Sequence, residues 1–572
     1  MNSLYLAIIG LAFLGLGYRF YASYISRKIY CLQNFTGEVP AKEFEDGIDF
    51  VPTKKSILFG HHFTSIAGAA PIIGPCIAAF WGWLPAMLWI VLGTIFMGAV
   101  HDFGALVVSV REKGKTIAEI TGTIISKRVK IIFLIFVMML SWLVLAVFAM
   151  AIAGLFVSIP TAVLPVNIEI LIALVVGFLL YRRKVDALIP SIVALFLLYI
   201  FVYIGTFTPL SFDFIGLDKS SQSTLWIILL FIYSGIASLL PVWLLLQPRD
   251  YINSHQLVVG LALIFIGIGI AQPIVEAPMI RPSGEGVPGI FPLLFVTIAC
   301  GAISGYHGLI ASGTTSKQIA NIQDTKMIGY GSMLGEGTLA LASTIAAVAG
   351  ISLVTNCNLP SIGVVEDLNW NIYYDTWAHA ATNKATAFVL GGGALIESLG
   401  IDPTLAKTIV AVLVISFAAT TLDTATRIQR FILTEVGQTL DISFLKNRYG
   451  ATFIAIIPAL ALTLWNIQDP VSGDLTKAGW VLWPIFGATN QMLASLILMM
   501  LTIYFWRLNK PVLPLMIPFI FVTITTLTSL AINARSFIGK NQLLLVIDGI
   551  LITLILWMLY EGWMVFRAGR SK

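Results

Sequence analysis

Ionisable side chains inside long apolar runs are the residues of this sequence best suited to chemistry. Glu336 lies well inside the apolar run 327–354, between Gly335 and Gly337, which let another backbone or a water molecule approach closely. A charged side chain in a membrane span costs about 2.5–3.5 kcal/mol on insertion scales, so each such residue is a functional candidate. We predict that Glu336 carries a proton; the alternative is a carboxylate held in place by an arginine or a histidine.

Three histidines lie beside glycines in two similar stretches. Gly60–Gly68 and Gly305–Gly313 both read Gly-x-His-x5-Gly. An imidazole suits a proton-linked switch or a hydrogen bond to a substrate carboxylate. We predict that His62 and His307 bind substrate and that His61 takes part in ion coupling. Adjacent histidines point to different sides of a helix, so only one of the first pair is expected to face a cavity.

Hydroxyl and amide side chains gather around the same two stretches and in one further run. A substrate carboxylate in a low-dielectric site needs hydrogen-bond donors, which hydroxyls, amides and the first amides of a half-helix can supply. The alternative role for each polar residue is a hydrogen bond between helices. The predicted substrate-binding residues of this kind are Thr64, Ser65, Gly68, Ser312, Thr314, Thr315, Asn490 and Gln491.

Asp423 lies in the threonine-rich segment Ala418–Arg427. Helical spacing puts Thr420 on the same face as Asp423, and hard cations such as sodium prefer oxygen ligands. We predict that Thr420, Thr421 and Asp423 contribute to binding a coupling ion, either Na⁺ or H⁺. The alternative is an ion pair between Asp423 and Arg427 at the cytoplasmic boundary.

The sequence predicts neither a cofactor nor an enzyme. The histidines form no HxxH or HxxxH pair, and the four cysteines have no metal-ligand spacing, so we expect small core residues rather than a metal site. His101 and Asp102 are expected to cap the cytoplasmic end of their span. No nucleophile elbow or phosphate-binding glycine loop occurs.

The segment Phe59–Pro75 must position many of these side chains. It is apolar enough for a bilayer, but Gly68, Pro71, Gly74 and Pro75 remove or strain helical hydrogen bonds. Freed backbone groups persist at membrane depth only where protein or a wet cavity satisfies them. We therefore expect broken helices at Gly60–Pro75 and Gly305–Ser316 that run in opposite directions and meet near the midplane, the pattern of an inverted-repeat transporter.

The composition is that of a polytopic membrane protein. Of its 572 residues, 58% are hydrophobic and 11% are charged, whereas about 25% are charged in soluble domains. Fifteen runs can cross a bilayer at about 20 residues per crossing. They lie at roughly 3–22, 57–80, 83–109, 131–157, 163–181, 187–206, 225–246, 256–275, 291–313, 327–354, 405–424, 451–466, 480–505, 511–534 and 543–566. A sixteenth, 385–399, is short and interrupted by glycines, so we expect it to be re-entrant.

These runs predict a single all-α polytopic membrane domain over residues 1–572, with about 15–16 transmembrane helices in a lipid bilayer. Lysine and arginine gather in alternate loops, and cytoplasmic loops carry that excess. We therefore expect the N-terminus outside and the C-terminus in the cytoplasm. The net charge of +5 is spread over the loops and gives no reason to expect a nucleic-acid partner. The oligomeric state stays open.

Several longer motifs resemble the carbon starvation protein A family of bacterial inner-membrane proteins. They are FGHHFTSIAGAAPIIGPCIAAFWGWLPA, HDFGALVVSVREKGKTI, LQPRDYINS, SGYHGLIASGTTSKQI, GYGSMLGEG, ATTLDTATR and FGATNQMLA. The match is strongest over 57–505, with 506–572 as additional C-terminal helices. The resemblance implies a transporter made when carbon is scarce, which takes up peptides and, in some members, pyruvate with protons.

Together, the residues and the resemblance predict a secondary active transporter that imports peptides, pyruvate or both across the bacterial inner membrane, coupled to protons. Two alternatives remain: a sodium-coupled carrier of small carboxylates, and a membrane sensor of a metabolite.

Overall fold

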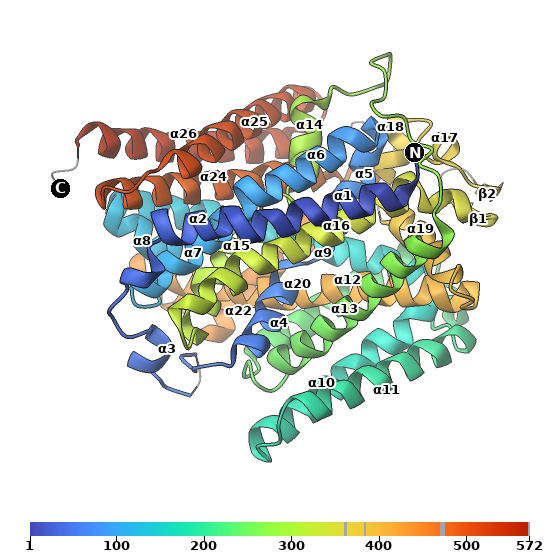
Figure 1. The fold of residues 1–572 in the computed structure, drawn as a ribbon, viewed down its shortest axis with the longest axis horizontal. Helices are drawn as coiled ribbons and strands as arrows, with labels where there is room; N and C mark the ends of the chain where they lie inside the picture. The colour runs from blue at the N-terminus through green and yellow to red at the C-terminus, as the bar shows by residue number, and fades with distance from the viewer. Residues whose placement is uncertain (48, 360–362, 383–384, 469–474, 570–572) are drawn as a thin grey trace.

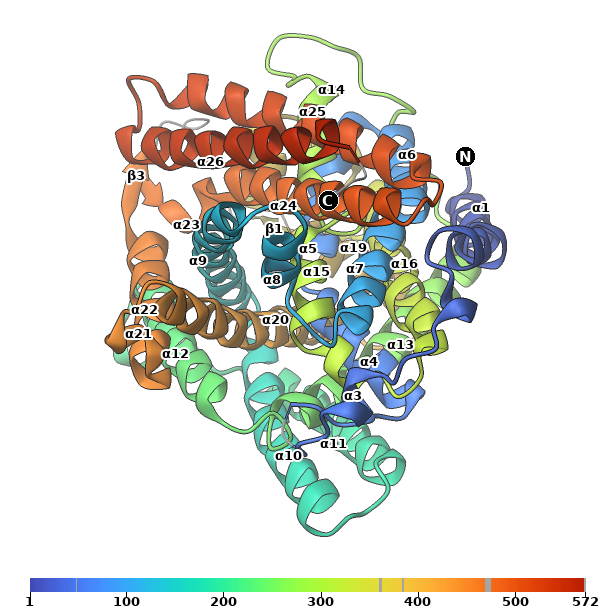
Figure 2. The same ribbon diagram turned by 90° about the vertical axis from the view of Figure 1, so that its left-hand side faces the viewer.

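The computed structural model describes residues 1–47, 49–359, 363–382, 385–468 and 475–569. Long helices lie side by side along one direction of the molecule (Figure 1). Figure 2 looks along the axes of several of them, including α1, α8 and α9. The predicted all-helical membrane class is confirmed.

Eleven helices in the described ranges are long and apolar enough to cross a membrane, or up to 12 if the bent pair α4 (Lys55–Ile66) and α5 (Ala70–Ala78) forms one span. The continuous helices are α1 (Ser3–Leu16) with α2 (Ala22–Tyr24), α6 (Trp83–Gly93) with α7 (Ala99–Arg111), α9 (Lys127–Ser158), α10 (Val163–Arg182), α11 (Leu188–Phe207), α12 (Lys219–Leu239), α13 (Leu246–Ala271), α20 (Pro403–Thr439), α24 (Trp483–Arg507), α25 (Leu513–Phe537) and α26 (Gln542–Arg567).

The remaining elements are shorter. The helices are α3 (Pro40–Glu43), α8 (Ile117–Ile124), α14 (Ile290–Thr297), α15 (Gly305–Gly313), α16 (Ser332–Val348), α17 (Trp370–Tyr373), α18 (Trp377–Thr382), α19 (Thr386–Glu397), α21 (Ser443–Lys446), α22 (Arg448–Leu464) and α23 (Ala478–Val481). Two antiparallel hairpins pair β1 (Asn356–Leu359) with β2 (Gly363–Glu366) and β3 (Asn466–Gln468) with β4 (Leu475–Lys477).

This number of long helices is lower than the predicted 15–16. The run at 291–313 divides into α14 and α15, and the run at 451–466 contains α22, which has 17 residues. The run at 327–354 contains α16, which continues directly from a π-helical segment at Lys326–Gly331 but is not among the eleven. The run at 385–399 forms α19, which has 12 residues. These segments are apolar enough to have been predicted as crossings. In the structure, glycine-rich breaks interrupt some of them, and others form helices that are too short to cross a bilayer by themselves.

The first break follows the predicted proline and glycine positions. α4 ends at Ile66, α5 begins at Ala70, and the two helices are bent by 49°. Pro71 lies in the first turn of α5, where its missing N–H would have no helical partner. Gly68, in the gap, lies against the side chains of Thr421 and Phe148.

The main interruption of the second broken helix lies before Gly305, whereas the prediction placed it at Thr314–Ser316, where α15 also ends. α14 ends at Thr297, and α15 begins at Gly305 and stays helical to Gly313. Gly301 has a φ of 92° in this gap, a conformation that side chains with a Cβ rarely adopt. The sequence placed the break at the polar Thr314–Ser316 segment, but the backbone turns where Gly301 allows it.

The two broken helices run in opposite directions, as predicted. Just before α4, the amide of Thr53 donates to the carbonyl oxygen of Gln318, which follows α15, at 3.1 Å. At the other end, the indole of Trp81 donates to the carbonyl oxygen of Pro288, which precedes α14, at 2.7 Å. The breaks therefore lie against each other inside the helical bundle.

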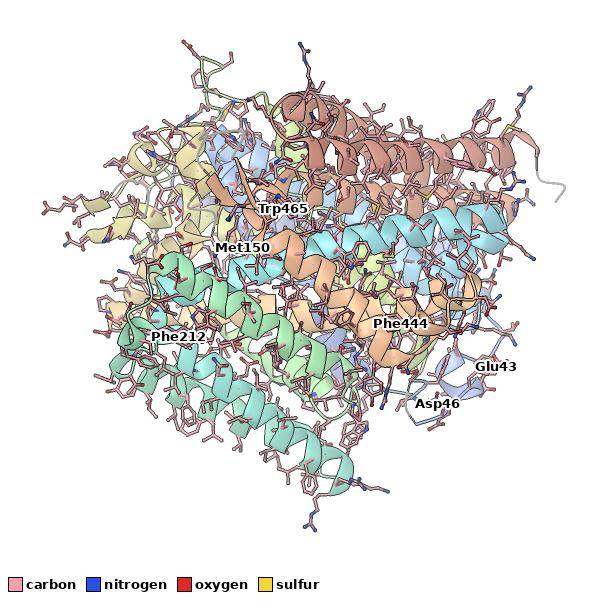
Figure 3. The ribbon with its side chains drawn as sticks, turned by 180° about the vertical axis from the view of Figure 1, so that it is seen from behind. Glu43, Asp46, Met150, Phe212, Phe444 and Trp465 are labelled. Carbon is pink, nitrogen blue, oxygen red and sulfur yellow. The ribbon has the colours of Figure 1, made fainter. Side chains whose placement is uncertain are left out.

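Charged side chains from several loops gather at one end of the bundle, while exposed apolar side chains lie on its sides. Several loops with predicted cytoplasmic basic residues meet at one end, where Lys113 pairs with Glu43 at 2.6 Å and Lys55 pairs with Asp324 at 3.6 Å. Figure 3 shows Glu43 at this end, and it shows Phe444 and Trp465 flanking α22. Both aromatic side chains are 56% exposed, as expected for a lipid-facing surface.

Replacing Gly74 by alanine should destabilise the contact between the broken helices. A Cβ at this position would lie 2.3 Å from the backbone oxygen of Thr297, which cannot rotate away. Such overpacking costs about 1–3 kcal/mol, so the detergent-solubilised Gly74→Ala variant should have a lower Tm. Gly549→Ala in α26 is the control, because a Cβ there meets nothing within 4 Å. Equal Tm values for the two variants would contradict the close approach.

Candidate functional site

A small cavity of about 20 Å³ lies between the two breaks. This volume is enough for one water molecule. The first break contributes Ser65 and Gly68, and the second contributes Cys300 and His307. Residues of α20 and α24 complete its polar wall, namely Thr421 and Asn490. The sequence predicted each of these residues except Cys300 as part of a site.

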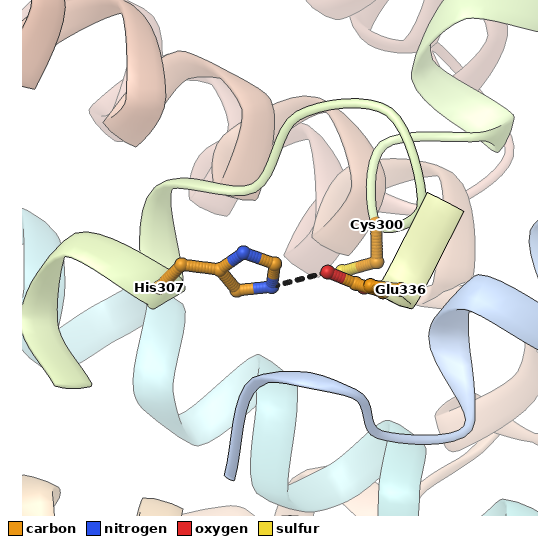
Figure 4. Close-up of side chains that lie close together, drawn as sticks. All are labelled: Cys300, His307 and Glu336. Carbon is orange, nitrogen blue, oxygen red and sulfur yellow. Dashed lines mark ion pairs between the residues drawn. The ribbon is translucent and has the colours of Figure 1, made fainter. Parts of the chain in front are cut away.

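His307 is the centre of one buried ionic cluster beside this cavity. Its Nδ1 lies 2.8 Å from Oδ2 of Asp102, and its Nε2 lies 3.3 Å from Oε2 of Glu336. Figure 4 shows His307 facing Glu336 and Cys300 across the gap between the second break and α16. Glu336 thus has the histidine partner that the sequence left as an alternative. Its predicted role in carrying a proton stays a prediction.

The prediction that His101 and Asp102 cap the end of a helix is wrong. Both are fully buried within α7, and Nδ1 of His101 lies 2.7 Å from Oδ1 of Asp102. The basic residues after α7 suggested that the span ends near His101 and Asp102, but the helix continues to Arg111. The position of Asp102 inside an apolar run was a sequence signal for a buried ionic contact, since such a charge needs a partner in the protein interior.

Backbone and amide groups fix the other members of the cluster. The amide of Gly301 donates to Oε1 of Glu336 at 3.1 Å. The side-chain amide of Asn490 donates to Sγ of Cys300 at 3.1 Å, and its Oδ1 accepts from the amide of Tyr306 at 3.0 Å. The break in the backbone therefore orients the ionisable side chains around it.

A second buried ionic cluster centres on Arg249 of α13. Its Nη1 lies 2.6 Å from Oδ2 of Asp423, and the Tyr233 hydroxyl donates to the same oxygen at 2.8 Å. The alternative pairing of Asp423 with Arg427 is not adopted. Arg427 instead donates to the carbonyl oxygens of Ala237 and Leu240 at the end of α12, where helical carbonyls lack partners of their own.

Asp250 connects this second cluster to the first broken helix. Its Oδ2 lies 2.8 Å from Nδ1 of His61 and accepts a hydrogen bond from Ser65 at 3.3 Å. The Thr64 hydroxyl donates to its backbone oxygen at 3.1 Å. Because Ser65 also lines the central cavity, the cavity lies between the two ionic clusters.

His61 and His62 diverge as expected for neighbours on a helix. His61 lines a cavity next to the charged loops, together with Lys317 and Arg427. His62 is fully buried, and its Nδ1 lies 2.9 Å from the hydroxyl of Thr315, so it joins the two glycine–histidine stretches directly.

Other predicted residues have structural partners. Thr420 accepts from the side chain of Asn253 at 3.0 Å, and the hydroxyl of Thr421 donates to the carbonyl oxygen of Phe417 at 3.1 Å. Gln491 joins α24 to the carbonyl oxygen of Phe295 at 3.1 Å, which is a hydrogen bond between helices. Ser312 and Thr314 line a larger cavity, described next.

A cavity of about 270 Å³ lies near the charged loops, between α8, α9, α15 and α20. Its lining includes Ser312, Thr314, Lys317 and Glu435. The structure therefore brings Ser65, Gly68, His307, Thr421 and Asn490 together at the central cavity and Ser312 with Thr314 at the larger one. Sequence reasoning missed Arg249, Asp250, Tyr233 and Cys300.

Known proteins of similar sequence carry the names of transporters. The chain is 31% identical to the peptide transporter CstA of Helicobacter pylori over 547 residues, covering 89% of this chain and 78% of that protein. It is 31% identical to the peptide transporter CstA of Escherichia coli and to the pyruvate/proton symporter BtsT of the same organism, each with the same two coverages.

A comparison with solved structures finds mutants of a manganese transporter from Eremococcus coleocola, at 14% identity and TM-scores up to 0.42, covering 91% of this chain and 98% of theirs. A profile described as "Carbon starvation protein CstA" matches residues 2–529. That match extends beyond 57–505 in both directions, and the chain belongs to the carbon starvation protein CstA family.

Proposed function

We propose that this protein is a secondary active transporter that imports peptides, pyruvate or both across the bacterial inner membrane during carbon starvation, with protons as the coupling ion. The observation that carries the proposal is a small cavity between two antiparallel broken helices, with polar side chains in its wall and a buried ionic cluster on each side. Broken helices of this kind hold substrates and ions in secondary transporters. The names of the relatives support the choice of substrates.

The polar groups around the central cavity suit a small carboxylate, and the cavity must widen to admit one, because its volume of about 20 Å³ holds a single water molecule. Ser65, Ser304 and Thr421 line it with hydroxyl groups, and the first turn of α15 begins beside it at Gly305. Helix N-termini and hydroxyls stabilise anions without a buried cation. Both pyruvate and the C-terminus of a peptide present such a carboxylate, so the same groups serve either substrate.

Arg249 and Asp423 are the proposed coupling pair, with His61 and Asp250 beside them. An arginine stays protonated, so only the carboxylate of the pair can change charge. A proton on Asp423 would free the guanidinium for another anion. Leaving one partner of a buried pair unmatched costs about 3–5 kcal/mol, and this cost links proton binding to substrate binding.

A proton fits this pair better than sodium does. Oδ2 of Asp423 already accepts from Arg249 and Tyr233, and Thr420 accepts from Asn253. A sodium ion at this point would lie next to a fixed positive charge. A proton needs no such space, because it resides on the carboxylate itself.

The charged end of the bundle is the cytoplasmic end in this proposal. It carries α3 and the C-terminal end of α26, whereas the N-terminus lies at the opposite end with α17 and α18 (Figure 1). Its loops hold the lysine and arginine excess of cytoplasmic loops. The larger cavity near Lys317 then forms the route by which substrate leaves toward the cytoplasm.

Uptake into proteoliposomes tests the proposed function directly. Labelled pyruvate and a labelled dipeptide are each supplied under an imposed proton gradient and, separately, under a sodium gradient. We expect accumulation above equilibrium of at least one substrate under the proton gradient. Accumulation under the sodium gradient alone would show that sodium, and not the proton, is the coupling ion. Failure of every combination with folded protein would reject the transport proposal.

Asp423→Asn should separate transport from coupling. The amide cannot carry the exchangeable proton, so gradient-driven accumulation should fall by about 5- to 150-fold, which corresponds to a coupling free energy of about 1–3 kcal/mol. Exchange of labelled for unlabelled substrate at equal concentrations should continue. Asp548→Asn is the control, since Asp548 is a buried carboxylate of α26. Undiminished accumulation by the Asp423 variant would remove this residue from coupling.

A further inference from the structure

Three different donor atoms converge beside the central cavity. Sγ of Cys300, a ring nitrogen of His307 and a carboxylate oxygen of Glu336 all lie within 4.8 Å of one another, and all three residues are buried (Figure 4). Their elements meet because the second break turns back against α16. A thiol, an imidazole and a carboxylate are the ligand types of zinc sites.

The spacing of two of these atoms fits a metal site as well as the ion pair that they form. Nε2 of His307 and Oε2 of Glu336 are 3.3 Å apart, and within the described residues neither atom makes a hydrogen bond. In a tetrahedral site with metal–ligand distances of about 2.0–2.2 Å, two ligand atoms are about 3.3–3.5 Å apart. A divalent cation between these two buried atoms would satisfy both, and Sγ of Cys300, which lies within 4.8 Å of them, would move closer to complete the site.

Each of the three side chains is also oriented by a further group. Nδ1 of His307 lies against Asp102, and this arrangement directs the lone pair of Nε2 toward Glu336. Gly301 and Asn490 hold Glu336 and Cys300 through the hydrogen bonds described above. Carboxylate–histidine–metal arrangements of this kind fix the ligand orientation and strengthen binding.

We propose that Cys300, His307 and Glu336 bind one zinc-like divalent cation whose open coordination position faces the central cavity. Cys300 would bind as the thiolate and release its proton on binding. Cys300 and His307 line the cavity, so the fourth position opens toward it. Three protein ligands and one open position characterise zinc sites that act on a bound molecule.

The open side of this ion would recognise the substrate, an extension that rests on the proposed function. Pyruvate can chelate a metal through one carboxylate oxygen and its 2-oxo oxygen. A peptide can chelate it through the terminal amine and the first carbonyl oxygen. Both form five-membered rings, and zinc accepts a fifth ligand. One ion could thus hold pyruvate by its carboxylate end and a peptide by its amino end.

Cobalt titration of the full-length protein in detergent, after treatment with a chelator, tests the metal site without measuring transport. Co²⁺ serves as the spectroscopic substitute for zinc. We expect one Co²⁺ per chain and a thiolate-to-cobalt charge-transfer band that Zn²⁺ abolishes. Absence of saturable Co²⁺ binding by folded protein would overturn the proposal.

Substitutions test whether the charge-transfer band arises from the site at Cys300, His307 and Glu336. Cys300→Ser should lose it, whereas Cys76→Ser, which replaces another buried cysteine, should keep it. Asp102→Asn should weaken Co²⁺ binding by about 10–100-fold while retaining the band. A band that survives in Cys300→Ser, or that disappears in Cys76→Ser, would contradict the assignment. Equal Tm values for the two serine variants and the wild type establish that folding is intact.

Two further measurements separate this inference from the proposed function. Pyruvate should change the visible spectrum of the Co²⁺ protein, whereas acetate, which lacks the 2-oxo oxygen, should change it much less; equal spectra would overturn substrate chelation. Zinc-free proteoliposomes should lose pyruvate uptake and regain it with Zn²⁺. Full uptake without metal would overturn the role of the metal in substrate recognition, but the proposed transport function would stand. Co²⁺ binding without any uptake would reject the transport function, but the proposed metal site would stand.

Discussion

Backbone groups freed by a helix break at membrane depth need partners inside the protein, and this constraint organises the molecule. Hydrocarbon offers no hydrogen bonds, so an exposed break would cost several kcal/mol per group. Here the two breaks lie against each other, and free amides of the second break find side-chain acceptors. Gly301 donates to Glu336, and Tyr306 donates to Asn490. The helices α16 and α24 surround the breaks because they carry those acceptors.

The same requirement applies to the charges. Asp102, Arg249 and Asp423 are all buried, and each lies beside an oppositely charged or ionisable side chain from a distant part of the chain. Such pairs are weak sources of stability, because desolvation offsets much of the attraction. Their placement on two sides of one cavity therefore favours a functional role. In such a pair, a proton can neutralise the carboxylate and an anion can take its place beside the cation.

Two buried cysteines illustrate how surroundings decide chemistry. Cys76 lies in α5, and its sulfur approaches the backbone oxygen of Ser343 at 3.9 Å, which is ordinary for a small core residue. Cys300 lies in the second break, where an amide, an imidazole and a carboxylate surround it. The residue type is the same, but the backbone turn at Gly301 places only one of the two beside ligand atoms.

The sequence by itself determined the helical membrane class, the first break near Gly68 and Pro71, and many residues of the central cavity. These are local properties, because apolar length, proline and glycine act through the chain's own backbone. Only the tertiary structure decided that Asp423 pairs with Arg249 rather than Arg427, that Asp102 faces His307, and that the second break precedes Gly305. The partners of a buried charge come from helices far apart in sequence, and helix packing brings them together.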